Sequence, residues 1–315
     1  MKFARRGSAV LFVSLALIAE ALTTGDARGA SFDCAKATPP IEKLICGDPT
    51  LSAADEAIAI AWQAALAASL DRTALRDEQR SWQHKRPATA PELEASYRRR
   101  IDKLNDETAK WRAMPRTFAV TELNASCFTT PEADADLTCH VEESGKVGGG
   151  DKLSYQLQGF FDGDLRMNGG AVIFAEAAGT LSPLLTAFDD TTHYNQPEVV
   201  RSAAGTLLWI PGHMEGTGNF NTGRLYIWSD GVWQDVDTKS WQGDMARRFP
   251  HGLYAAKGIY PDYRTMTGAT PLWRPEDANC CAKGGRATFR LGLKDRRLGL
   301  DDLRITLGRA AAERE

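Results

Sequence analysis

Glycine is distributed unevenly along this chain. Of its 28 glycines, one, Gly47, falls between residues 31 and 112, a segment rich in alanine, glutamate, arginine and leucine. Glycine, threonine and aromatic residues dominate from about residue 117 to residue 310, and Met114-Pro115 precedes the change. Because glycine disfavours helices and the first set of residues favours them, we expect an α+β protein. Its helical domain would span 31–112 and its β-rich domain 117–310.

The helical segment contains three amphipathic patterns. Apolar residues recur at three- and four-residue spacing within 51–66, 75–82 and 93–111, which predicts three helices. Asp48 and Asp71 precede the first two patterns and suit the N-cap position of a helix. Three helices of this size enclose a small core, so a disulfide would contribute strongly to the stability of such a domain.

The second segment consists of short runs of branched and aromatic residues separated by turn formers. Ser229-Asp230-Gly231, between two of these runs, predicts a hairpin, and a helix is expected near 239–248. Strands at this spacing predict an antiparallel sandwich, barrel or propeller-like sheet, without choosing among them. The expected strands are 118–123, 137–142, 153–159, 171–175, 198–202, 206–210, 224–228, 232–236, 286–293 and 298–305.

The first thirty residues have the layout of a secretory signal peptide. A basic start at residues 2–6 precedes an apolar run at 9–22, and small residues then offer cleavage after Ala27 or Ala30. The apolar run is too short for a bilayer-spanning helix. We therefore expect residues 1–30 to be removed, leaving a periplasmic or secreted protein without a membrane span.

Six cysteines suit an exported chain, in which oxidised pairs are stable. No Cys-x-x-Cys occurs, which disfavours a structural zinc site. A pairing of Cys127 with Cys139 is favoured as a hairpin staple, whereas Cys280 and Cys281 can bond each other or the other pair. The candidate disulfide residues are Cys34, Cys46, Cys127, Cys139, Cys280 and Cys281.

The net charge argues against nucleic acid as a partner. The whole chain has a formal charge of −3, and residues 1–30 carry four bases and two acids, so the remainder is near −5. Nucleic-acid binding would need a basic stripe, which the sequence lacks. A mildly acidic surface favours cationic partners weakly.

Short motifs run through the helical segment in a defined order. They are Phe32-x-Cys34, Glu42, Ile45-Cys46, Asp48-Pro49, Leu51 with Asp55, Gln79-Arg80-x-Trp82, Arg86, and Tyr97-x-x-Arg100-Ile101-x-x-Leu104. Together, over residues 31 to about 105, they resemble the LprI-type lysozyme-inhibitor domain; the β region is assigned to no family. Relatives commonly carry a second cysteine pair between the Trp and the Tyr, and its joint absence here supports a Cys34–Cys46 disulfide. Most of these residues also suit structural roles in a helical core.

The resemblance implies a binding protein that protects peptidoglycan from c-type or other lysozymes. Inhibition would require hydrogen-bond donors that pair with the carboxylates of a muramidase cleft. The basic run Arg98, Arg99, Arg100 and Lys103 supplies such donors, although a charge run is also typical of a solvated helix face.

The sequence offers few candidates for catalytic residues. Asp189 lies near His193 in sequence, and His213 lies near Glu215, but two such ligands do not make a catalytic metal centre. We therefore expect no enzyme activity, no catalytic residue, no cofactor and no metal. A hydrolase would become plausible if either pair lay within hydrogen-bonding distance in a pocket.

An alternative function rests on the aromatic residues of the β segment. Their density suits a core, or a face that binds peptidoglycan, another glycan or an envelope protein, with the helical domain serving only a structural role. The aromatic residues concerned are Trp209, Trp228, Trp233, Trp241, Tyr260, Tyr263 and Trp273.

Overall fold

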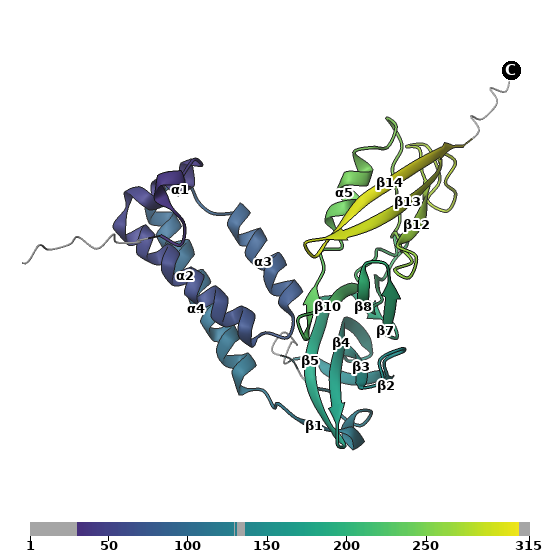
Figure 1. Cartoon of the computed structure of the whole chain (residues 1–315), viewed down its shortest axis with the longest axis horizontal. Helices are drawn as coiled ribbons and strands as arrows, with labels where there is room; N and C mark the ends of the chain where they lie inside the picture. Colours follow the sequence, from purple (N-terminus) through teal and green to yellow (C-terminus); the bar gives the residue numbers. More distant parts are fainter. Residues whose placement is uncertain (1–29, 129, 131–135, 309–315) are drawn as a thin grey trace, which may run out of the picture.

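The structure, a computed structural model, describes residues 30–128, 130 and 136–308 (Figure 1). The expected signal peptide lies outside this part of the chain except for Ala30, as do residues 309–310 of the expected β domain. Every helix among the described residues is too short or too polar to cross a bilayer. The α+β class is confirmed, with a helical unit (residues 30–113) followed by a β unit (residues 114–308) built from antiparallel sheets.

The helical unit contains the three expected helices and one more. Asp48 and Asp71 cap α2 and α3 as predicted, because their carboxylates accept from Thr50 N at 2.8 Å and Ala74 N at 2.9 Å. The additional helix, α1, has only eight residues and no side-chain cap. The elements are η1 (Cys34–Lys36), α1 (Pro40–Gly47), α2 (Pro49–Ala68), α3 (Arg72–His84) and α4 (Ala90–Ala113).

The core of the helical unit lies mainly between α2 and α4. Alanines on α2, including the buried Ala61 and Ala65, allow the two helices to approach closely around Tyr97 and Leu104. Helix α3 stands apart from this pair in Figure 1 and meets it through long side chains. Trp82, for example, packs edge-on against Tyr97 with ring centroids 5.3 Å apart.

The β unit contains four sheets, and every pairing between its strands is antiparallel. The five-stranded sheet has the order β1 (Phe118–Ala119), β5 (Thr180–Asp190), β4 (Leu165–Ala177), β3 (Leu153–Asp162), β2 (Thr138–Lys146). The four-stranded sheet has the order β11 (Val232–Asp235), β10 (Arg224–Ser229), β8 (Gly205–Ile210), β7 (Glu198–Ser202). The smaller sheets are β12 (Thr267–Leu272), β13 (Gly285–Lys294), β14 (Arg297–Leu307), and β6 (Thr192–Tyr194) with β9 (Gly212–Met214).

The four-stranded sheet is the middle layer of the β unit. In β8, Leu208 and Ile210 face a core shared with the five-stranded sheet. Leu207 and Trp209 face the opposite way, toward a second core formed with α5 (Ser240–Ala246) and the three-stranded sheet. A strand covered on both faces can be apolar at every position, which explains this unbroken apolar run.

Several local expectations are confirmed and others are wrong. The β10–β11 hairpin turns at Asp230 and Gly231, both with positive φ, and α5 lies where a helix was expected. The expected strand 118–123 is wrong after its second residue, because a 3₁₀ turn, η2 (Val120–Glu122), follows β1. Strand β5 was missed because Pro183 interrupts its pattern; a register shift in β4 lies opposite this proline.

Three disulfides are present. Cys34 bonds Cys46 and Cys127 bonds Cys139, with Cα–Cα distances of 5.8 and 6.3 Å, and Cys280 bonds its neighbour Cys281. The second bridge is not a hairpin staple, because β1 and β2 lie at opposite edges of one sheet. It instead joins β2 to the connection that follows η2.

The two units meet where the α2–α3 turn reaches β5. Thr186 N donates to Leu70 O at 3.2 Å, and Phe188 N donates to Asp71 Oδ2 at 3.3 Å. These bonds extend the five-stranded sheet beyond the short strand β1, which covers β5 only at Leu181 and Thr180. The turn therefore fixes the base of α3 against the β unit.

Candidate functional site

A hollow of about 440 Å³ lies between α3 and α4. We call it the basic hollow, because four of its lining residues are cationic and one is acidic. Its position on a flank of α3 follows from the separation of this helix from α4. The lining residues are Glu78, Ser81, Trp82, Lys85, Ser96, Arg99, Arg100 and Lys103.

The basic hollow gathers three of the four residues of the predicted binding run. Arg99, Arg100 and Lys103 line it, and Lys85 at the end of α3 joins them. Arg98 does not; it is exposed and forms an ion pair with Glu94 at 2.7 Å along α4. The run is thus divided between two faces of the helix, as expected for consecutive helical residues.

Arg100 lies at the buried side of the hollow. Its side chain is 4 % exposed; Nε donates to Gln79 Oε1 at 2.9 Å, and Nη1 is 3.1 Å from Glu78. Within the described part of the chain, Nη2 of this residue has no hydrogen-bond partner. A buried donor without an acceptor costs free energy, and an acceptor that reached Nη2 would remove this cost.

Glu78 offsets part of the positive charge. Burial alone would raise the pKa of Glu78, but the hydrogen bond from Lys103 and the charge of Arg100 hold this pKa below its usual value. Lys85 and Arg99 are exposed, and neither has an ion pair among the described residues. The hollow therefore keeps a surplus of positive charge.

A larger cavity of about 570 Å³, the interdomain cleft, separates the helical unit from the β unit. Its helical wall includes the apolar residues Ile58, Ala59, Trp62 and Leu66 of α2. Seven cationic side chains and five aspartates also line it. They are Arg76, Arg80, Arg86, Arg224, Lys239, Arg296, Arg297, Asp55, Asp77, Asp235, Asp237 and Asp295.

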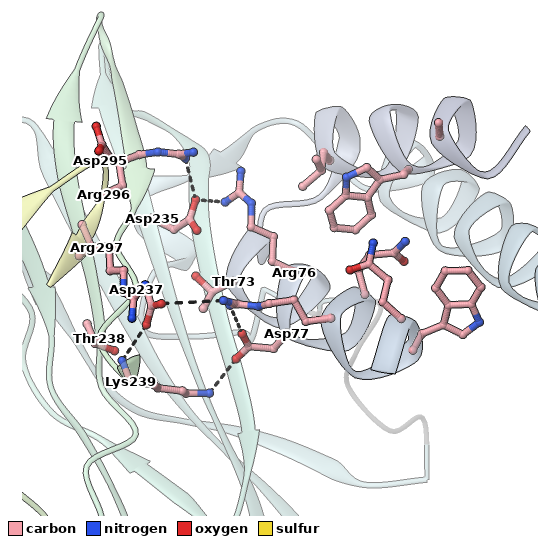
Figure 2. Close-up of a pocket in the computed structure, with 18 of the residues that line it drawn as sticks. Thr73, Arg76, Asp77, Asp235, Asp237, Thr238, Lys239, Asp295, Arg296 and Arg297 are labelled. Atoms are coloured by element: carbon pink, nitrogen blue, oxygen red, sulfur yellow. Dashed lines mark hydrogen bonds and ion pairs between the residues drawn. The ribbon is translucent and has the colours of Figure 1, made fainter. Parts of the chain in front are cut away.

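Ion pairs cross the interdomain cleft from α3 to the β unit (Figure 2). Arg76 of α3 pairs with Asp235 at the end of β11, and Asp77 pairs with Lys239 at 2.7 Å. Burial would raise the pKa of Asp77, but Lys239 and Arg80 lower it overall. These contacts join the first half of α3 to the β unit.

Six of the motif residues noted in the sequence of the helical segment line this cleft. Tyr97 is completely buried, and its hydroxyl donates to Asp55 Oδ1 at 2.6 Å. Burial, followed by the bond to Asp55, raises the pKa of Tyr97. Arg86 lies 5.7 Å from the centre of the Trp82 ring and donates to the Tyr97 hydroxyl at 3.4 Å. The six residues are Asp55, Gln79, Arg80, Trp82, Arg86 and Tyr97.

A buried polar cluster at the base of the cleft is structural in character. Arg224 donates to Asp189 at 2.8 Å, and Tyr194 donates to the same carboxylate oxygen at 2.7 Å. Asp71 is nearby and caps α3; burial raises the pKa of its carboxyl group, and the charge of Arg224 opposes this change. The cluster fixes the junction of the two units.

The histidines pair differently from the sequence hypothesis. His193 contacts Glu215 across the β6–β9 ladder, and its ring stacks on His213 with centroids 5.5 Å apart. Asp189 is engaged by Arg224 and Tyr194 instead. Among the described residues, no group of three or more His, Cys, Asp or Glu side chains could hold a metal ion.

Most of the candidate aromatic residues of the β unit form its cores. Two of them, Trp228 and Tyr260, are 48 % and 43 % exposed. The other five are buried: Trp209, Trp233, Trp241, Tyr263 and Trp273.

Sequence reasoning missed the main residues of the cleft, because Arg76, Asp235 and Arg296 are far apart in the chain. The nearest signal was the cluster of matched motifs on α3 and α4. No protein-family model matches the chain, and comparison with curated proteins gives no match either.

Proposed function

We propose that this protein is an exported, periplasmic or secreted binding protein that inhibits a muramidase, as does the LprI-type family that its helical unit resembles. It acts by binding and carries out no catalysis. The disulfides support an oxidising destination. The observation that carries the proposal is the basic hollow, which has four cations around a single carboxylate.

Charge explains how such a hollow would act. A muramidase cleft typically contains two catalytic carboxyl groups. Arg99 and Lys103 are exposed at the hollow and can pair with such groups; Lys103 also pairs with Glu78 and, at 3.6 Å, with Glu107. Arg100 behind them has a buried donor without a partner among the described residues. Charge-assisted hydrogen bonds to a carboxylate are stronger than neutral ones, especially where the partner excludes water. The acidic remainder of the chain would steer a cationic lysozyme toward the protein.

The test measures lysis of a bacterial suspension by c-type lysozyme in the presence of the purified full chain. We expect the unaltered protein to slow lysis. The double variant Arg99→Ala with Lys103→Ala should raise the half-inhibitory concentration on the order of tenfold, since two charged contacts are removed from the hollow.

Arg98→Ala is the matched control, because Arg98 belongs to the same basic run but lies outside the hollow. It should inhibit within about twofold of the unaltered protein. Undiminished lysis at a large excess of the unaltered protein would remove the proposal. An equal loss of inhibition in the Arg98 variant would show that the hollow is not the contact.

A further inference from the structure

The interdomain cleft has more guanidinium donors than carboxylate acceptors at one point. Arg76 Nη1 and Arg296 Nη1 both approach the same oxygen of Asp235, the second at 3.7 Å (Figure 2). Burial first, and then repulsion from Arg296, Arg72 and Arg80, lowers the pKa of Arg76. The Asp235 carboxylate thus pairs with one arginine of the helical unit and one of the β unit. Other arginines lie close to Arg76.

The turn that presents Arg296 is strained. Lys294 pairs with Arg297, so Asp295 and Arg296 form a two-residue hairpin loop with φ of 50° and 59°. The second position of such a loop strongly favours glycine. An arginine in left-handed backbone costs stability, and strain of this kind concentrates at functional sites.

The strained loop is fixed in place. Asp237 N donates to the carbonyl of Arg296 at 2.8 Å, and Leu298 N donates to the carbonyl of Asp237 at 3.0 Å. The Arg296 side chain is 46 % exposed, so the loop offers a held but accessible cation. Because this loop lies opposite α3, guanidinium hydrogen-bond donors reach the cleft from both the helical unit and the β unit.

The facing wall suits the body of a sugar. Trp62 lines the cleft with Ile58, and an aromatic ring packs well on the C–H face of a pyranose. Gln83 and Thr238 add polar groups for hydroxyls. A fatty acid would use the apolar wall and the cations but would make no hydrogen bonds to these polar groups.

We propose that the interdomain cleft binds a saccharide that carries a carboxylate. The carboxylate accepts from N–H groups of Arg76 and Arg296 other than those that point to Asp235, and the ring packs against the wall that contains Trp62. This site goes beyond the proposed inhibition of a muramidase and does not rest on it, because it uses the other flank of α3.

The experiment titrates the full chain with N-acetylmuramic acid and with N-acetylglucosamine, and measures binding by ligand-observed saturation-transfer NMR. The two sugars differ by a lactyl carboxylate. We expect the acidic sugar to bind more tightly, on the order of tenfold, because it alone can accept from the two arginines. Laurate serves as an anionic probe without a sugar ring and should bind more weakly than the acidic sugar.

Arg296→Gly separates binding from structure. Glycine relieves the left-handed strain and should raise the melting temperature by about 2 °C, whereas the affinity for N-acetylmuramic acid should fall on the order of tenfold. Arg201→Gln removes an exposed arginine of β7 that lies outside the cleft, and should leave the affinity unchanged.

Three results would overturn the proposal. They are equal affinity for the two sugars or no measurable binding of the acidic one at millimolar concentration, tighter binding of laurate, and unchanged affinity in a folded Arg296→Gly variant. No lysozyme is present in these titrations, so their failure would leave the lysis assay unaffected.

Discussion

The buried glutamines of β3 and the buried Arg100 of α4 have different surroundings. In the β unit, Gln158 and Gln156 are almost fully buried, and their amides bind backbone atoms such as Phe128 O at 2.9 Å and Leu123 O at 2.7 Å. These bonds hold the segment that contains Leu123 and Phe128 against the five-stranded sheet. In the helical unit, by contrast, Arg100 is buried with a free donor beside a hollow. Gln156 and Gln158 thus stabilise the fold, whereas Arg100 adjoins a candidate binding surface.

The two units also differ in how their cores are closed. Each large sheet of the β unit is covered on both faces, and the cores involve residues distant in sequence. The helical unit has one core, and its α3 flank is open to two hollows. Its disulfide and capped helices must therefore contribute more of its stability.

The largest expected effect tests the packing of the β unit. Trp241→Ala removes a side chain that is 1 % exposed and stacks near Phe289, with centroids 5.0 Å apart. We expect a loss of about 3–5 kcal/mol in the free energy of unfolding. Hydrogen exchange with mass spectrometry should show faster exchange in β13 and α5, while α2 and α4 keep their protection. Equal loss of protection in both units would show that the two units do not have separate cores.

A smaller effect tests the Cys34–Cys46 disulfide of the helical unit. Cys34→Ser with Cys46→Ser should cost about 2–3 kcal/mol, because the unfolded chain regains the freedom of the closed loop. In the same exchange measurement, protection should fall in α1 and α2. The Trp241→Ala variant serves as the reciprocal control, and faster exchange in α5 of the serine variant would argue against independent cores.

The smallest effect tests the ionic contact between the units. The pKa of Asp77 is below its usual value, so its contribution to stability is present above about pH 4 and is lost as the pH falls through the lower folded-state pKa. Asp77→Asn should therefore reduce stability at pH 7 by less than about 1 kcal/mol and have no effect near pH 2. Thermal melting across this pH range measures the difference.

Asp102→Asn provides the control for this measurement, since Asp102 is exposed on α4, away from the cleft. Its melting temperature should follow that of the unaltered protein at every pH. A constant difference between the Asp77 variant and the unaltered protein down to pH 2 would show that charge is not the cause.

Local signals in the sequence predicted local structure well. The caps at Asp48 and Asp71 and the turn at Asp230-Gly231 are confirmed, because each depends on a few adjacent residues. Strand β5 was missed because it contains Pro183, which disfavours a strand. The register shift in β4 that accommodates this proline cannot be seen in the sequence of β5. The number and stacking of the sheets depend on distant contacts, so no local pattern could choose among the three architectures.

The candidate sites were predicted less completely for the same reason. The run 98–103 was visible, but its division between an exposed ion pair and the basic hollow depends on where α3 lies. The meeting of Arg76 with Arg296 requires the β13–β14 loop to reach α3, across more than two hundred residues of sequence. Composition and periodicity contain no information about such an encounter.

The contact of Leu70 and Asp71 with β5 has a consequence for solubility. An uncovered edge strand presents free N–H and C=O groups to which the strand of another molecule can add, and this is a route to aggregation. The α2–α3 turn occupies that position at Thr186 and Phe188. The helical unit thus acts as a shield for its neighbour, and a chain that lost it would also lose protection against self-association.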